Sequence, residues 1–203
     1  ELEFVLSSLL PLGSKGTTGT QASFLELFDG DYEKVKLLDQ KIADKMGFAR
    51  TVPVSGQTYS RKMDSRVLKA YKKLGFTVTV DPSVNYGGCF NAHSRSIILR
   101  FEDETVYHEL GHFLAFVAGN VDRSSDFAAV YNSEKSKFTG INRSYATQNS
   151  SEYFAESVLE YVTSPSTLKR QRPKTYAAIV EALNKITDER IQRVMDIYGP
   201  FWR

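Results

Sequence analysis

Residues 105–118 have the sequence TVYHELGHFLAFVA. Four apolar residues in this stretch recur at intervals of three and four: Val106, Leu110, Phe113 and Val117. That spacing places them on one side of an α-helix. Gly119 and Asn120 follow, and both residue types end helices because they adopt the left-handed backbone conformation at low cost. The pattern predicts a helix over 105–118 with one apolar side against a core.

The same stretch contains His-Glu-x-x-His, formed by His108, Glu109 and His112, in a chain with only three histidines. A spacing of four puts the two imidazoles one turn apart on one face, where both can bind one zinc ion while Glu109 acts on a bound water. The alternative is a helix surface on which the two histidines have Glu109 as an ordinary neighbour. Both histidines lie opposite the apolar residues, however, so their face is free to line a cleft.

A catalytic zinc needs a third protein ligand and an open position for water. Ala118 stands where the metzincin pattern has its third histidine, which excludes that class. The best-placed carboxylates are Glu152 and Glu156, which share one face of a helix predicted over 151–163. Glu152 can bind the metal, and Glu156 can accept the outer N–H of a ligating histidine. Residues 149–152, NSSE, also resemble a capping box, in which Glu152 would bond back to the helix start.

Two stretches together resemble a known family: residues 108–112, HELGH, and residues 145–156, YATQNSSEYFAE. They are similar to the catalytic core of the anthrax lethal-factor-like (ATLF-like) zinc metallopeptidases, which include secreted bacterial Pro-Pro endopeptidases. In that family a tyrosine seven residues before the glutamate ligand points into the site, and Tyr145 stands seven residues before Glu152. The resemblance is specific over about 104–161 and does not cover residues 1–24.

The resemblance implies a role for each matching residue. The zinc ligands would be His108, His112 and Glu152, with Glu109 as general base and Tyr145 as oxyanion stabiliser. The remaining candidates for the third ligand are Glu156, Asp122 and Glu134. Without the resemblance, Tyr145 does not stand out among eleven tyrosines. The other two potential soft ligands, His93 and Cys89, have no motif partners and are expected to be structural residues near the sheet.

The rest of the chain predicts an α+β fold, mainly α-helical, and the resemblance implies a zincin-like domain with a small mixed β-sheet and an active-site helix. Helices are predicted over 31–46, 64–74, 123–138, 151–163, 174–185 and 188–197, and strands over 76–80 and 96–101. Residues 86–90, YGGCF, are predicted to form a flexible turn and 139–149 a polar loop. Pro165 and Pro173 are expected to interrupt regular secondary structure after residue 163. The basic cluster 169–174 is expected to be a solvated turn between helices.

The expected substrate is a protein or peptide lying extended along an edge strand, for which Ile97–Phe101 is the candidate, with residues 86–90 as a flexible rim. The resemblance admits selectivity for proline-containing sites, although these residues alone do not indicate proline. The competing interpretation is a catalytically inactive peptidase-like binding module.

Composition limits the other possibilities. A length of 203 residues predicts one catalytic domain, 25–203, after a flexible Ser-, Thr- and Gly-rich lead-in, 1–24. A net charge of +2 argues against a nucleic-acid partner, and no apolar run is long enough for a membrane span. The single cysteine excludes an intrachain disulfide and a cysteine-rich structural zinc site. We expect a monomer, and the family resemblance implies a secreted bacterial protein; the start at Glu1 suits a form whose signal peptide has been removed.

Overall fold

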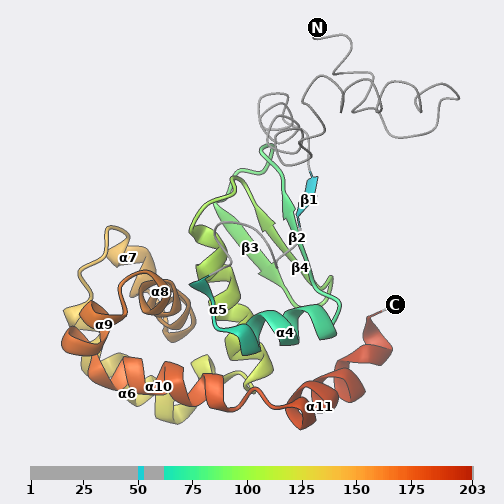
Figure 1. Ribbon diagram of the computed structural model, residues 1–203. Coiled ribbons are helices and arrows are strands. Elements are labelled where there is room, and N and C mark those ends of the chain that lie inside the picture. The colour runs from blue at the N-terminus through green and yellow to red at the C-terminus, as the bar shows by residue number, and fades with distance from the viewer. Residues whose placement is uncertain (1–49, 53–61, 203) are drawn as a thin grey trace, which may run out of the picture. The chain divides into compact units, whose positions relative to one another are not determined.

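The computed structural model describes residues 50–52 and 62–202, which belong to the compact unit Ala49–Arg203. The α-helices are α4 (Ser65–Lys73), α5 (Thr105–Val117), α6 (Ser125–Glu134), α7 (Arg143–Ala146), α8 (Ser150–Thr163), α9 (Pro165–Gln171), α10 (Pro173–Asn184) and α11 (Asp188–Tyr198). Short 3₁₀ turns are η2 (Val121–Arg123), η3 (Lys135–Lys137) and η4 (Gly199–Phe201). The predicted α+β, mainly helical fold is confirmed (Figure 1). The predicted lead-in 1–24, the boundary at residue 25 and the helix over 31–46 lie outside the described residues.

The described strands form one mixed sheet in the order β1-β2-β4-β3. They are β1 (Arg50–Val52), β2 (Thr77–Val80), β3 (Gly88–Asn91) and β4 (Ser96–Leu99). β2 and β4 run parallel, while β1 and β3 pair antiparallel with their neighbours. Buried valines in β2 and buried Ile97 and Leu99 in β4 give the sheet its apolar side.

The sheet order overturns two predictions about the substrate edge. The predicted edge strand Ile97–Phe101 was wrong, because β4 lies between β2 and β3 and has no free edge. The predicted flexible turn 86–90 was also wrong, because its second half lies in β3, an edge strand. Its two glycines suggested a turn, but a strand also uses glycine where another group approaches its backbone closely.

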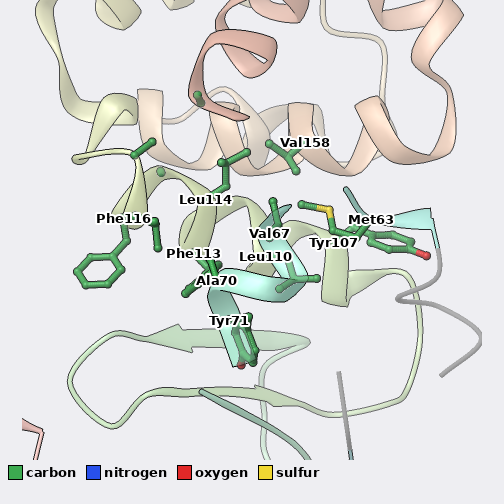
Figure 2. Packing of buried hydrophobic residues seen from close by; sticks show 14 of the residues in the cluster. Met63, Val67, Ala70, Tyr71, Tyr107, Leu110, Phe113, Leu114, Phe116 and Val158 are labelled. Carbon is green, nitrogen blue, oxygen red and sulfur yellow. The ribbon is translucent and has the colours of Figure 1, made fainter. Parts of the chain in front are cut away.

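Helix α5 lies between the sheet and the helices α6 to α10 (Figure 1). It is buried along nearly its whole length, so the predicted single apolar side underestimated its burial. Phe113 packs edge-on against Tyr71 of α4, with ring centroids 4.8 Å apart, and Leu114 faces Val158 of α8 (Figure 2). Each such large side chain contributes roughly 1.5–3 kcal/mol when fully buried. The packing therefore holds the histidine-bearing helix on both sides.

Helix termini follow the local signals in the sequence. Gly75 after α4 has φ +72°, and Gly119 and Asn120 after α5 have φ +100° and +57°, as their residue types predict.

The prediction of a polar loop over 139–149 was wrong in part, because this segment contains the single-turn helix α7. Pro165 and Pro173 each occupy the first turn of a helix, where the missing proline N–H has no helical partner to lose.

Arg172 corrects the prediction of a solvated basic turn over 169–174. Its side chain is fully buried and donates hydrogen bonds to Ser157, at 2.7 Å, and to Glu160. The guanidinium also lies over the rings of Phe138 and Tyr153, 4.8 and 5.1 Å from their centroids.

Among the described residues, no helix has both the length and the apolar character needed to cross a membrane.

Candidate metal centre and active site

Two helices bring three potential ligands to one point. His108 and His112 project from successive turns of α5, and Glu152 projects from the first turn of α8. The close approach of these helices depends on Gly111, because a Cβ there would lie 2.8 Å from the Ala155 Cα. The glycine inside His-Glu-x-x-His thus lets α8 deliver Glu152 to the two histidines.

The spacing of the three donor atoms suits a tetrahedral zinc ion. Nε2 of His108 lies 3.2 Å from Nε2 of His112 and 3.2 Å from Oε2 of Glu152. Nε2 of His112 lies 3.6 Å from the same oxygen. Donors at zinc bond lengths around a tetrahedron are separated by roughly 3.3–3.5 Å. The buried Oε2 of Glu152 has no hydrogen-bond partner of good geometry among the described residues. A buried carboxylate oxygen without such a partner fits the role of a metal ligand.

The two interpretations of Glu152 prove compatible. The side chain of Asn149 accepts a hydrogen bond from the Glu152 backbone N–H at 2.8 Å and so caps α8. The Glu152 carboxylate does not complete a capping box; it faces the two histidines instead. Asn149 therefore stabilises the helix start and leaves the Glu152 side chain available for the site.

The electrostatics of the site favour a bound cation. Three carboxylates, on Glu109, Glu152 and Glu156, surround the two imidazoles. Burial of the His108 ring works to lower its pKa, but its contacts with Glu152 and Glu156 outweigh burial and raise that pKa to about 9. Contacts with His108 and His112 hold the pKa of Glu152 well below its usual range. A divalent cation would balance this excess of negative charge.

Glu109 is held between α5 and the edge strand β3. Its side chain is buried, which raises the pKa of its carboxyl, while His108, His112 and a hydrogen bond from the Phe90 backbone N–H oppose that effect. Gly88 lies so close that a Cβ there would be 2.5 Å from Oε1 of Glu109. Sequence reasoning missed this role of Gly88 and Phe90, although paired glycines near strand residues indicate a close backbone approach.

Tyr145 reaches the site from α7. Its ring lies 6.0 Å from the His108 ring, and its hydroxyl is hydrogen-bonded to Glu152. Partial burial and the neighbouring Glu152 raise the pKa of Tyr145, so the hydroxyl keeps its proton and can donate it to a hydrogen bond. The side chain remains about half exposed, at 47%, and faces a cavity where a substrate could meet it.

Of the other candidate ligands, Glu156 alone lies at the site. Its Oε1 is 3.4 Å from Nδ1 of His108, on the opposite side of the ring from the metal-facing nitrogen. Asp122 accepts a hydrogen bond from Ser151, and Glu134 accepts hydrogen bonds from the Thr175 backbone and hydroxyl at the start of α10. Both carboxylates are therefore committed to structural contacts.

His93 and Cys89 lie on the β3–β4 hairpin, and both residues are exposed. Neither belongs to the His108, His112 and Glu152 group of potential ligands found in the described part of the chain. Their predicted position near the sheet agrees with the structure, whereas their side chains are exposed rather than packed.

A cavity of about 920 Å³ opens beside the potential metal site. Its lining includes Tyr86, Gly87 and Gly88, before and in β3, and the loop 138–142. His108, Glu109 and Tyr145 line the same cavity. A peptide entering it would therefore meet the start of the edge strand β3, His108, Glu109 and Tyr145 together.

Comparison with known families agrees with this geometry. The sequence model of the family "Anthrax toxin lethal factor, N- and C-terminal domain" matches residues 18–182. The chain belongs to this family. The match includes His108, Glu109, His112, Tyr145 and Glu152. Membership supports a relationship to lethal-factor-like metalloproteases, and the His108, His112 and Glu152 group is the possible metal-binding set of this lethal-factor-family chain.

A second, short similarity links part of this lethal-factor-family chain to adenylosuccinate lyases. This chain is 59% identical to the Saccharomyces cerevisiae adenylosuccinate lyase over 56 residues, which are 28% of this chain and 12% of the yeast protein. The Schizosaccharomyces pombe protein is 55% identical over 65 residues and the Schistosoma mansoni protein 50% identical over 66, each match covering 32% of this chain and 14% of the relative. The chain thus spans only about an eighth of these curated relatives, too little to transfer their activity. No solved structure matches significantly.

Proposed function

We propose that this chain is a zinc-dependent endopeptidase that hydrolyses peptide bonds of protein or peptide substrates. The observation that carries the proposal is that His108, His112 and Glu152 converge on one point, and that His108 also lines a cavity together with the buried Glu109. The ligand set of two histidines and one carboxylate leaves a fourth position open, as catalytic zinc sites do. When bound, zinc would polarise a water and the substrate carbonyl and lower the pKa of that water to about 7.

Glu109 would move the proton. Its carboxylate lies against the backbone of Gly88, interacts with the Phe90 backbone N–H and lines the cavity. It would accept a proton from the attacking water and deliver it to the leaving amine nitrogen. Burial, which raises the pKa of this carboxyl, favours the transient protonated form that such a relay requires.

Tyr145 and β3 would handle the substrate. The protonated Tyr145 hydroxyl would donate a hydrogen bond to the carbonyl oxygen as it gains negative charge. β3 is an edge strand next to Glu109, and its outer backbone groups other than the Phe90 N–H can pair with an extended peptide. Selectivity for proline-containing sites remains part of this proposal, and a cleavage-site peptide library tests it: cleavage without preference around proline would remove it.

Glu109→Gln tests the central assignment. The variant should bind zinc as the wild type does, because Glu109 is outside the ligand set, yet lose at least about 100-fold in kcat as a base is removed. Glu189→Gln, a change at an exposed glutamate of α11, is the matched control and should cleave normally. Chelation should abolish wild-type cleavage and added zinc should restore it. Undiminished proteolysis by Glu109→Gln would sink the assignment.

The inactive binding module makes a different prediction. Such a protein would bind zinc and peptide but show no turnover by the wild type under any zinc loading. Secretion, which the family relationship favours, is tested by locating the full-length gene product in culture supernatant or in cells. The proposed monomeric state is tested by light scattering of the purified chain.

A further inference from the structure

The helix that carries Tyr145 cannot hold its own position. α7 is a single turn, Arg143–Ala146, and an isolated turn has too few hydrogen bonds to offset the cost of ordering it. Residues 139–145 are all exposed, and only Ala146 is fully buried. The location of the Tyr145 hydroxyl must therefore depend on contacts from other segments.

Two hydrogen bonds supply those contacts. The Tyr131 hydroxyl of α6 donates to the backbone oxygen of Thr147, the residue directly after α7, at 2.6 Å. Arg143, at the start of α7, donates to the backbone oxygen of Ser136 in η3 at 3.1 Å. Both ends of the turn are thus tied to the segment 125–137.

Tyr131 is itself firmly held. Its ring packs edge-on against Tyr153, with centroids 5.3 Å apart, and the Lys135 ammonium lies over the Tyr131 ring, 4.4 Å from its centroid. Tyr153 follows Glu152 directly in α8. Tyr131 therefore connects α7, through its hydroxyl, to α8, through its ring, and α8 presents the third potential zinc ligand.

We propose that Tyr131 is a positioning residue that sets the Tyr145 hydroxyl against His108 and Glu152. The proposal rests on the proposed peptidase function for its kinetic consequence, but not for the anchoring itself. A hydroxyl placed in advance stabilises the developing oxyanion without reorganisation during the reaction. Loss of the anchor would lower kcat and leave KM nearly unchanged, because Tyr145 would act mainly on the transition state.

Hydrogen exchange tests the anchor without reference to activity. Tyr131→Phe removes one hydroxyl and should speed amide exchange in residues 139–149 by roughly 2- to 10-fold, the factor expected for one hydrogen bond. Tyr71→Phe is the matched control, because the Tyr71 hydroxyl donates to the Thr77 backbone oxygen at the same 2.6 Å but between α4 and β2. It should leave exchange of 139–149 unchanged. Equal exchange in Tyr131→Phe and wild type would overturn the proposal.

Kinetics on the zinc-loaded full chain test the consequence. Tyr131→Phe should lower kcat roughly 10-fold at unchanged zinc content, whereas Tyr71→Phe should not. Arg143→Met, which removes the second tie, should act in the same direction. In a Tyr145→Phe background, Tyr131→Phe should have no further effect on kcat, because the hydroxyl that it positions is gone.

The outcomes separate the two proposals. An equal kcat loss from Tyr131→Phe with and without the Tyr145 hydroxyl would assign Tyr131 a general structural role and overturn the positioning proposal. An unchanged kcat in a protein whose wild type cleaves would do the same. A wild type without turnover would refute the peptidase, while the exchange measurement would still decide whether Tyr131 anchors α7.

Discussion

The backbone of Gly88 in β3 lies directly against the carboxylate of Glu109, so closely that a Cβ at position 88 would be 2.5 Å from Oε1 and 3.0 Å from Cδ. The edge strand β3 therefore packs in direct contact with the proposed general base. A Cβ at position 88 would also meet the Thr105 methyl group at 2.9 Å. Since all these atoms end side chains rather than belong to the backbone, they can shift while the fold survives.

Gly88→Ala should displace the Glu109 carboxylate and lower kcat by roughly 10- to 100-fold, because misplacement of a reacting group by about 1 Å has effects of that size. Zinc content and the unfolding midpoint should change little. Gly87→Ala is the control, since a Cβ there would meet only Thr105, at 4.0 Å. Equal activity of the two variants would contradict the contact's functional role.

Gly111→Ala should disturb the fold and the metal site together. The added Cβ would meet Ala155 Cα at 2.8 Å and its backbone oxygen at 3.1 Å, and backbone atoms cannot move aside cheaply. We expect a loss of about 1–3 kcal/mol in unfolding free energy and weaker zinc binding, because α5 and α8 separate. Gly199→Ala, whose nearest neighbour is the flexible Met195 side chain at 3.4 Å, should be tolerated in both assays.

Glu156→Ala should weaken zinc binding by about 10- to 100-fold, as removal of partners behind a ligating histidine typically does. The carboxylate lies 3.4 Å from Nδ1 of His108, where it can orient the ring. Glu156→Gln should restore part of the affinity, because its amide oxygen can still accept a hydrogen bond. Competition with a chelator measures both, with the exposed Glu181→Ala as control; unchanged affinity in Glu156→Ala would refute the orienting role.

Arg172→Leu should lower the unfolding free energy by about 3–5 kcal/mol, because Glu160 loses its buried partner and the rings of Phe138 and Tyr153 lose the guanidinium that lies over them. Arg170→Leu, two residues away and exposed, should stay within about 0.5 kcal/mol of wild type. Denaturant unfolding measures the pair, and similar losses in the two variants would show that the burial of Arg172 is not what matters.

Asp64 gives a pH-dependent contribution to stability. Its side chain caps α4 by accepting from the Arg66 N–H at 2.9 Å, and its hydrogen bond with the Arg66 side chain lowers the pKa of its carboxyl. Since the pKa is lower in the folded state, the stabilisation is present above about pH 4 and is lost as pH falls through the folded-state value.

Asp64→Ala should therefore cost about 1 kcal/mol at pH 7, and the difference from wild type should shrink below about pH 4. Urea unfolding at pH 7 and pH 3 measures the change. Asp126→Ala, at an exposed position in the first turn of α6, serves as control. A difference that stays constant between the two pH values would contradict the ionised cap.

Local sequence patterns predicted those parts of the fold and of the candidate site that depend on residues close in sequence. The helix α5 and its ends follow from a period of three and four and from Gly119 and Asn120, and the pairing of His108 with His112 follows from one helical turn. The position of Glu152 early in a second helix was also predictable, because Asn149 provides the cap.

The remainder depends on contacts between segments far apart in sequence, which no local period records. Only the tertiary structure decided that Glu152 faces the histidines while Asn149 caps the helix, that β3 rather than β4 is an edge strand, and that Arg172 is buried in a basic cluster. The sequence by itself determined which residues can do the chemistry and how those within α5 are spaced. The packing of α5 against β3 and α8 decided which of those residues meet, because strand pairing and helix contact are set by the burial of the whole core.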